Sequence, residues 1–551
     1  MPLRGTYSQS QGIIHGNRFY VSTFPNAIFD DGRMEYHQFF TQIDWLVVAG
    51  YLALTTWVGH ALKGKQSTIR DFFLGGRTLP WPAVSGSIIA TEISGVTFIG
   101  VPGMVYAATG DFTYLQWGLG SIVARVLVGV YFVKAFYEKE IYSPYDYMGN
   151  RLGIGAKRLA TIIFQIGGIL GQSVRVLVAA LALKVVTPLE FEHCIWIIGL
   201  FAVGWTWMGG MRTVIWTDVM QFFLFVGAGL LSLFWIVFHI DGGWTQMVDT
   251  AEEAGKFTLL NLTTDPAVGF TLWVAIIAVP FQNLSAFGVD QLNAQRMFCC
   301  RDASDARKAM IASSAALLLT TLMLFVGTAL YAYYEPMRMA GTEPAIFAED
   351  GNYVYPVWIV TELPAGLRGL ILAGIFAAAI SSLDSILAAL SQTTLSLIRD
   401  RKNRQDAGEA KDLFLSRLLV LIWGILLAAF AVELDGLRGK VNVVVLAFGM
   451  ISYTTGPMLG MFLASLLTPH ASAKGLSLGF ALSFALVAYL RPDLYQILLN
   501  FDFISYDDVD RWSGLSVNGE KLGITINTAW AWPVTVFLTW GCGLLFPRRM
   551  Q

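Results

Sequence analysis

The chain has 551 residues, of which 55% are hydrophobic and 14% are charged, and its formal net charge at pH 7 is −2. A soluble protein carries about 25% charged residues, so this composition excludes an ordinary soluble protein and indicates many membrane spans. The near-neutral charge, without a basic tail, excludes nucleic acid as a partner.

Apolar runs between short charged loops predict membrane-spanning helices, because about 20 apolar residues cross a bilayer as a helix. We expect thirteen spans, at residues 43–63, 81–108, 113–136, 157–186, 191–209, 214–240, 268–293, 308–334, 362–397, 412–434, 441–468, 473–490 and 529–546. Lys and Arg are richer in one set of alternating loops, among which we count Arg296. By the positive-inside rule this set is cytoplasmic, which predicts a multi-pass protein of the cell (inner) membrane with its N-terminus outside and its C-terminus in the cytoplasm.

Two predicted spans carry helix-breaking residues. The second reads IIATEISGVTFIGVPG, with Gly95 and Pro102 inside the run, and the seventh reads IIAVPFQNLSAFGVD, with Pro280 and Gly288 inside it. Proline removes a backbone donor, and freed backbone groups at membrane depth must line a cavity or be buried in protein. Ordinary membrane glycines and prolines are the alternative. Matched breaks five spans apart favour a transporter built from inverted repeats, with its binding site near the midplane.

The ninth predicted span, AGIFAAAISSLDSILAALSQTTLSLIRD, carries polar side chains in an apolar helix. Ala378, Ser381, Ser382 and Ser385 are spaced i, i+3, i+4 and i+7 and therefore form one stripe. Such a stripe allows close helix packing, and its hydroxyl groups also suit a hard cation. Asp384 lies beside the stripe, and a carboxylate inside the membrane is a functional hypothesis by default.

A second carboxylate of this kind is Asp218, about one turn into the sixth span. Alternatively, Asp218 is an acidic residue at a helix N-terminus, where the helix dipole stabilises a negative charge.

Six short motifs resemble signatures of the sodium/solute symporter family, and the resemblance covers about residues 43–470. The motifs are DFFLGGR (71–77), ATEIS (90–94), WTDVMQ (216–221), DQLNAQR (290–296), AAAISSLDS (377–385) and GPMLG (456–460). The resemblance implies an all-α membrane protein of the leucine-transporter type, with ten core helices in two inverted five-helix repeats.

The resemblance also implies a domain organisation. An external N-terminal segment (1–42) and an extra span (43–63) precede the first repeat (81–240), the second repeat (268–468) follows, and two further spans with an external loop (473–551) complete the chain.

Among the family's members, the chain resembles the sialic acid transporters most, and the family pattern implies two sodium sites. The residues of the shared site are Ala90, Ile93, Ala378, Ser381 and Ser382. Those of a second site are Asp218, Ser381, Asp384 and Ser385. Position 384 holds a serine in the sialic acid pattern, so the extra carboxylate could bind the second ion or take a proton, and the stoichiometry of one or two sodium ions stays open.

The solute pocket implied by the resemblance lies between the broken helices and their neighbours. Its candidate residues are Glu92, Ser94, Thr97, Gln116, Arg175, Phe281, Gln282 and Asn283. Glu92, Thr97 and Gln116 depart from the polar set of the sugar transporters, so a glucose or galactose pocket is not supported. Arg175 lies one turn from Gly171, the position at which the sialic acid transporters hold a substrate carboxylate, and a guanidinium pairs with a carboxylate bidentately. An internal ion pair, for example with Glu92, is the alternative role for Arg175.

We therefore predict a sodium-coupled symporter that imports a small polar organic solute, such as a sugar, a sugar acid or another carboxylate, by alternating access. We expect Na⁺ as its only metal, no organic cofactor, a lipid bilayer around it and activity as a monomer. One alternative is a proton-coupled transporter of the same fold. Another is a transporter-like sensor, which would carry a signalling domain that we do not expect in a chain ending at Gln551. A membrane enzyme is disfavoured because the six histidines form no catalytic cluster.

Overall fold

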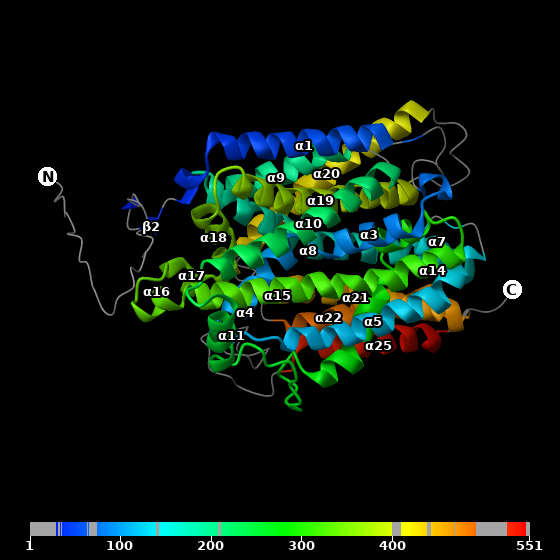
Figure 1. The fold of residues 1–551 in the computed structure, drawn as a ribbon. Coiled ribbons are helices and arrows are strands. Elements are labelled where there is room, and N and C mark those ends of the chain that lie inside the picture. The colour runs from blue at the N-terminus through cyan, green and yellow to red at the C-terminus, as the bar shows by residue number, and fades with distance from the viewer. Residues whose placement is uncertain are drawn as a thin grey trace, which may run out of the picture.

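The computed structural model describes residues 29–30, 33–34, 36–62, 64, 74–138, 141, 143–207, 211–398, 409–437, 442–468, 470–491 and 526–546. Within these residues the chain is almost entirely helical (Figure 1). The strands β1 (Phe29–Asp30) and β2 (Arg33–Met34) pair antiparallel.

The long helices account for most of the predicted spans. Nine expected spans form one helix each: α1 (Gln42–Leu62), α8 (Ile154–Val186), α9 (Phe191–Thr206), α10 (Met211–Phe238), α19 (Leu367–Ile398), α20 (Glu409–Asp435), α21 (Val443–Leu467), α22 (Ala473–Leu490) and α25 (Ala531–Leu545). The other four are composite: α3 (Trp81–Glu92), η3 (Val96–Gly100) and α4 (Val101–Tyr106); η4 (Thr113–Gln116), α5 (Trp117–Leu127), η5 (Val128–Phe132) and α6 (Val133–Tyr137); η6 (Val274–Ala278), α12 (Val279–Gly288) and α13 (Gln291–Met297); and α14 (Ala303–Ala312), η7 (Ser313–Ala315) and α15 (Ala316–Tyr333).

Shorter helices connect the long ones at the two ends of the bundle. They are η1 (Tyr36–Phe39), η2 (Gly75–Arg77), α7 (Pro144–Leu152), α11 (Gly243–Glu253), α16 (Glu335–Met339), α17 (Ala345–Glu349), η8 (Gly351–Tyr353), α18 (Val354–Glu362) and η10 (Thr528–Trp530). Helices α11, α16, α17 and α18 gather at one end, and α7 and α14 lie at the other (Figure 1). We call these the α11 end and the α7 end.

Each of the thirteen predicted spans thus contains helix. By length and hydropathy, eight helices of the described residues are long and apolar enough to cross a membrane, and the bent pair formed by α3 and η3–α4 makes a ninth. Helix α9 and the helix over Val274–Gly288 are shorter apolar helices. The count of thirteen therefore stays a prediction.

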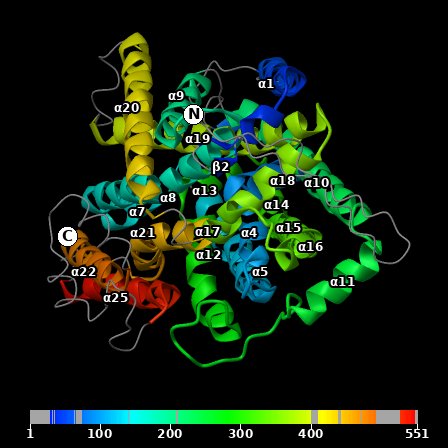
Figure 2. The same ribbon diagram turned by 90° about the vertical axis from the view of Figure 1, so that its left-hand side faces the viewer.

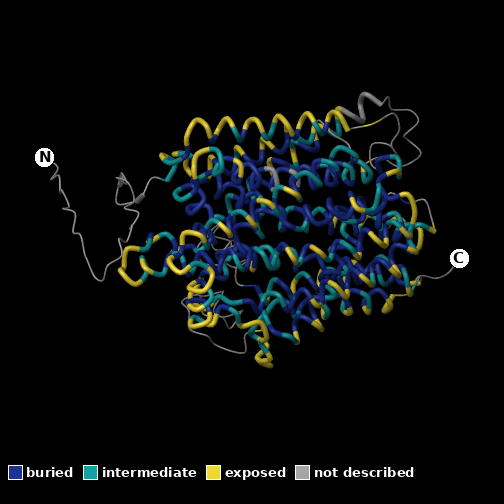
Figure 3. The backbone as a smooth tube through the Cα atoms, in the orientation of Figure 1, coloured by how far each residue is buried: buried dark blue, intermediate teal, exposed yellow. Residues whose placement is uncertain are grey.

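Burial is concentrated along the axis of the bundle (Figure 3). Helix α8 is central: it packs against α9, α19, α20 and α21, and most of its side chains are buried. The outer faces carry large exposed apolar side chains, among them Trp57, Phe223, Leu318 and Phe537. A buried centre with an apolar outer surface is what a helical bundle needs in a bilayer, where backbone groups are satisfied within each helix.

Helix α1 lies at the outside of the bundle, packed on α10 and α19 (Figures 1 and 2). Its buried Asp44 accepts hydrogen bonds from the backbone N–H of Gly366 at 2.7 Å and of Gly369 at 3.2 Å, at the start of α19. The first N–H groups of a helix lack partners within the helix. Asp44 therefore caps α19 from a neighbouring helix and fixes the extra N-terminal span to it.

The first predicted break is confirmed. Helix α3 ends at Glu92, the backbone of Ile93 is extended (φ −76°, ψ 96°), and the two halves of the span are bent by 55°. The second differs from the prediction. Residues 274–288 are continuously helical, because the π-helical turn η6 precedes Pro280 and places the proline at the start of α12, where its missing N–H is tolerated. The chain instead breaks after Gly288, and Asp290 caps α13 by accepting from the Leu292 N–H at 2.8 Å.

Candidate ion and solute site

The break between α3 and η3 lies in the buried centre of the bundle. Ala90, Ile93 and Ser94 are buried, and α3 is in contact with α10, α13 and α19. The last carbonyl groups of a helix have no partner within it, and they give its C-terminal end a partial negative charge. Of the predicted sodium ligands, Ala90 thus lies in the last turn of α3 and Ile93 directly after it, where the backbone leaves the helix.

Arg175 reaches this break from α8. Its Nη1 donates a hydrogen bond to the carbonyl oxygen of Thr91 at 3.1 Å, and its side chain is partly buried. The predicted carboxylate ligand therefore lies next to the backbone of Thr91, the residue that precedes Glu92 at the end of α3. A guanidinium has five N–H donors, so one bond to Thr91 leaves donors for a solute.

Glu92 is paired with a different arginine. Arg125 of α5, which is 1% exposed, donates to the Glu92 carboxylate and, at 2.7 Å, to Ser313 Oγ, and it stacks over the ring of Phe287 with its Cζ 4.0 Å from the ring centroid. A third of the Glu92 side chain is exposed. The sequence left two roles open for Arg175, a solute ligand or an ion pair with Glu92. In the structure the ion pair with Glu92 is made by Arg125 instead.

This pair predicts a stability effect. Removing one partner of a buried ion pair leaves an uncompensated charge and costs about 3–5 kcal/mol; we expect Glu92→Gln to fall at the lower end, since water reaches Glu92. The double variant Glu92→Gln/Arg125→Met, which removes both charges, should regain most of the loss. Thermal unfolding of the purified protein measures both, and a single variant as stable as wild type would refute the structural role of the pair.

The predicted ligands of the ninth span lie on α19, in the part that faces the other core helices. Ser382 is 1% exposed, and Asp384 and Ser385 are also buried. Asp384 has a side-chain hydrogen bond with Thr206 of α9. The helical backbone includes Ala378 and Ser381, whose side chains lie outside the described part of the structure. Helix α19 contacts α3, so the two elements that the resemblance assigns to the shared sodium site lie side by side.

Asp218 lies in a fully buried polar cluster. Its Oδ2 accepts from Ser87 Oγ at 2.5 Å and from Arg296 Nη2 at 3.0 Å. The same Nη2 donates to Ser385 Oγ at 3.0 Å, and Arg296 Nε donates to Ser87 Oγ at 2.9 Å. We call Asp218, Ser87, Arg296 and Ser385 the Arg296 cluster; it joins α3, α10, α13 and α19.

Two members of this cluster, Arg296 and Ser87, are not predicted as site residues from the sequence. Arg296 was counted among the cytoplasmic loop residues, and this was wrong, because it is 1% exposed and ion-paired inside the bundle. The predicted seventh span ended at residue 293, so Arg296 fell just outside it. The signal that pointed the other way is the sequence DQLNAQR, in which Asp290 caps a further helix and Arg296 falls on its last turn. Ser87 carries no signal beyond being a small polar residue in an apolar span.

The remaining predicted solute residues have mixed surroundings. Asn283 Nδ2 donates to Gln282 Oε1 at 2.7 Å, and both side chains are buried on α12. Phe281 packs on Phe537 of α25 with ring centroids 5.5 Å apart. Gln116 Nε2 donates to the carbonyl oxygen of Phe270 at 3.2 Å, so it fastens η4 to a connecting segment. Thr97 is partly buried on η3.

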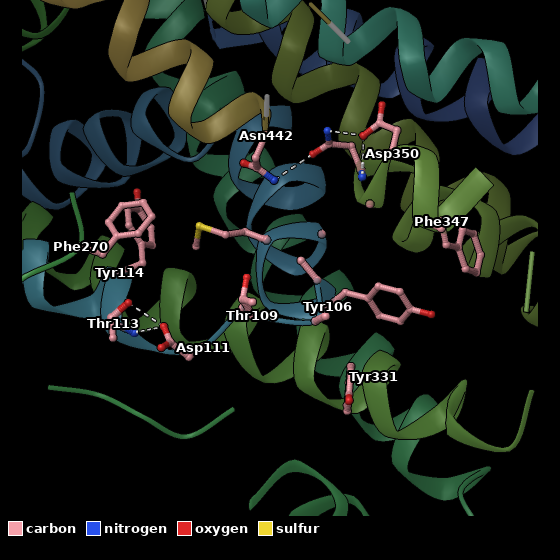
Figure 4. A pocket seen from close by; sticks show the side chains of 18 of the residues that line it. Tyr106, Thr109, Asp111, Thr113, Tyr114, Phe270, Tyr331, Phe347, Asp350 and Asn442 are labelled. Atoms are coloured by element: carbon pink, nitrogen blue, oxygen red, sulfur yellow. Dashed lines mark hydrogen bonds between the residues drawn. The ribbon is translucent and has the colours of Figure 1, made fainter. Parts of the chain in front are cut away.

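A cavity of about 790 Å³ lies at the α11 end of the bundle, beyond the C-terminal end of α4. Figure 4 shows Tyr106, Asp111, Tyr114, Asp350 and Asn442 among its walls. None of the eight predicted solute residues lines it. Thr97 and the lining residue Met104 are seven residues apart, which is about 10 Å along a helix. The cavity therefore lies on the α11 side of the break rather than at it.

A buried lysine holds the helix end beneath this cavity. Lys256 Nζ donates to the carbonyl oxygens of Val105 at 3.0 Å and of Ala107 at 2.6 Å, at the C-terminal end of α4. Burial and, to a lesser extent, the nearby positive charge of Arg338 lower the pKa of Lys256 to about 8. A cation is favoured at a helix C-terminus, so Lys256 fixes the α4 half of the broken span.

Comparisons with known proteins agree on one family. Residues 72–482 match the model of the "Sodium:solute symporter family". The sodium/sialic acid symporter of Proteus mirabilis is 30% identical over 85% of this chain and 93% of its own. The sodium/glucose cotransporter of Vibrio parahaemolyticus is 28% identical over 82% of this chain and 85% of its own. Human sodium-coupled monocarboxylate transporter 1 is 27% identical over 80% of this chain and 72% of its own.

A solved structure gives the same result for the fold. The substrate-bound, outward-open structure of a sodium-coupled sialic acid symporter covers 93% of this chain and 99% of its own, with a TM-score of 0.74 and 26% identity. The fold class expected from the sequence, an all-α membrane protein of the leucine-transporter type, is confirmed.

Proposed function

Because the chain belongs to the sodium:solute symporter family, we propose that it couples sodium to the import of a small organic acid through the site at the α3–η3 break. It is a multi-pass membrane transporter and not an enzyme, and it imports a small organic solute with sodium. The identity of the solute, the ligands of sodium and the orientation in the membrane are the proposed parts.

The observation that carries the proposal is the broken helix α3, packed against α19. Carbonyl groups at the end of α3 and the buried hydroxyl of Ser382 on α19 are hard oxygen ligands suited to Na⁺. We assign the shared sodium site to the backbone of Ala90 and Ile93 with Ala378, Ser381 and Ser382 of α19. A cation there also meets the negative end of the α3 dipole.

We assign the solute to the other side of the same break, with Arg175 as the group that holds its carboxylate. Arg125 forms an ion pair with Glu92, whereas the hydrogen bond of Arg175 goes to a neutral group, the Thr91 carbonyl, with Asp290 and Glu92 as acidic neighbours. The relatives that carry sialic acid and monocarboxylates transport acids of this kind by name. Ser94, Thr97, Gln282 and Asn283 supply further polar groups around the break.

We place the protein in the cell membrane with the α11 end outside, acting as a monomer. The 790 Å³ cavity is then the external vestibule through which sodium and solute reach the break. Sodium binds first and bridges α3 and α19, the solute follows, and closure of the vestibule precedes release to the cytoplasm. The coupling is reciprocal, since each ligand raises the affinity for the other by the same factor.

The test is thermal stability of the purified protein with sugars, sugar acids and monocarboxylates, each in sodium and in potassium. A ligand at about 100 times its Kd stabilises the native state by about 2.7 kcal/mol. We expect a shift with one class of carboxylate, in sodium alone. Shifts with neutral sugars instead would overturn the acid assignment. Equal shifts in potassium would contradict sodium coupling and favour a proton-driven mechanism through the buried Asp384.

A further inference from the structure

The connector that follows α11, residues 254–271, exposes several large apolar side chains. Leu259 is 48% exposed, Leu260 60% and Leu262 58%. Single apolar residues on a surface are ordinary, whereas a contiguous apolar patch marks a contact with another molecule or with a membrane. We call these three side chains the leucine patch, and its place on the protein indicates what it contacts.

The leucine patch continues a surface that faces lipid. Trp273, at the start of η6, donates from Nε1 to the carbonyl oxygen of Leu262 at 3.1 Å. The next turn of the same predicted span exposes Ile276 and Ile277. Lipid tails are as apolar as leucine, so large apolar side chains on the outer face of a span are in contact with them. The patch therefore lies directly beside a lipid-facing part of the bundle.

A second helix gives the depth of the patch. The backbone N–H of Asn261, which lies between two leucines of the patch, donates to Gln116 Oε1 at 3.3 Å. Trp117 Nε1 donates to the carbonyl oxygen of Gly269 at 3.1 Å. Gln116 and Trp117 belong to the first turns of Thr113–Tyr137, which is long and apolar enough to cross a membrane. The connector therefore lies level with the start of two predicted spans, which is the depth of the boundary between headgroups and acyl chains.

The connector has a polar side toward the protein and an apolar side away from it. Toward the protein, Lys256 Nζ binds the carbonyl oxygens at the end of α4, and the backbone of Asn261 binds Gln116. Away from it, the leucine patch is exposed along the edge of the molecule, where the connector runs between α11 and α12 (Figure 2). A segment that lies in the membrane interface has this division, with its apolar side buried about 5–10 Å into the boundary of headgroups and acyl chains.

We propose that the leucine patch is inserted into the bilayer interface at the α11 end and anchors the connector to lipid. Lipid is the contact that fits, because the patch carries no charge and is continuous with the lipid-facing side of η6. Through Lys256 the anchored connector is joined to the broken second span. The inference goes beyond the proposed function, since it depends neither on the solute nor on the ion that drives transport.

The test is spin-label accessibility of the full-length protein in liposomes. A nitroxide is attached to Leu260→Cys, and its relaxation by oxygen, which concentrates in lipid, is compared with its relaxation by a water-soluble nickel chelate. Ile277→Cys on η6 is the lipid-facing reference, and Thr264→Cys, in an exposed polar stretch of the same connector, is the aqueous reference. We expect the oxygen-to-nickel ratio at position 260 to lie near that of position 277 and well above that of position 264.

Two further samples complete the design. The four native cysteines are buried, so labelled wild type measures the background. Leu262→Cys is a second label site in case Leu260→Cys does not fold, and it should give the same ratio. Relaxation mainly by nickel at both positions, as at position 264, would place the patch in water and overturn the proposal. Shielding from both reagents would also overturn it, because the patch would then be covered by protein, either a second copy or another part of this chain.

Discussion

Ser382→Ala should raise the sodium concentration for half-maximal uptake by at least about tenfold, which corresponds to about 1.4 kcal/mol of binding free energy. Ser382 is 1% exposed on α19, the helix that packs against the broken α3. Removing its hydroxyl takes one oxygen ligand from the proposed shared site, and the apolar alanine side chain that remains cannot bind Na⁺. Ser381→Ala should act in the same direction.

The control for this effect is Ser396→Ala, further along the same helix. Ser396 Oγ donates to the carbonyl oxygen of Thr393 within α19, so its loss changes the helix without touching the proposed site, and its sodium curve should match that of wild type. The measurement is initial uptake rate against sodium concentration in proteoliposomes. Unchanged sodium curves in Ser381→Ala and Ser382→Ala would refute the assignment of the shared site.

Arg175→Ala should strongly reduce uptake of carboxylate solutes. A hydrogen bond to a charged group is worth about 1.5–3 kcal/mol, so loss of the guanidinium predicts a fall in kcat/KM of about ten- to 150-fold or more. Arg175→Lys keeps the charge but loses the bidentate fork and should retain part of the activity. Arg158→Ala, an exposed arginine on the same helix, is the matched control.

Arg175 also has a structural bond, to the carbonyl oxygen of Thr91, and the test must separate the two roles. The methyl ester of the transported acid lacks the charge that Arg175 is proposed to bind. If Arg175 is a ligand, the variant loses binding of the acid far more than binding of the ester. An equal loss for both compounds would mean that the arginine only shapes the break.

Local sequence patterns predicted the helices well, because each span is set by its own apolar length. The break in the second span was also predicted, because Gly95 and Pro102 lie inside its apolar run, and the structure places the break at Ile93. In the seventh span the same reasoning marked both Pro280 and Gly288, and the chain breaks only after Gly288. Pro280 is accommodated at a helix start by a π-helical turn, and a proline alone does not distinguish that outcome from a broken helix.

The partners of buried charges could not be read from the sequence. Arg125, Arg175 and Arg296 all lie in or near apolar spans, and their separation in sequence from Glu92, Thr91 and Asp218 is large. Which arginine meets which oxygen depends on how the helices pack. The family resemblance indicated which region of the chain holds the site. Only the packing of the helices shows which arginine pairs with which oxygen in that region.

Sodium-driven accumulation tests the central claim most directly. The purified protein is reconstituted in liposomes, and uptake of the carboxylate found in the stability screen is followed with sodium outside, with equal sodium on both sides, and with a proton gradient in potassium alone. We predict accumulation above the external concentration only with an inward sodium gradient. Accumulation driven by the proton gradient without sodium would contradict the account.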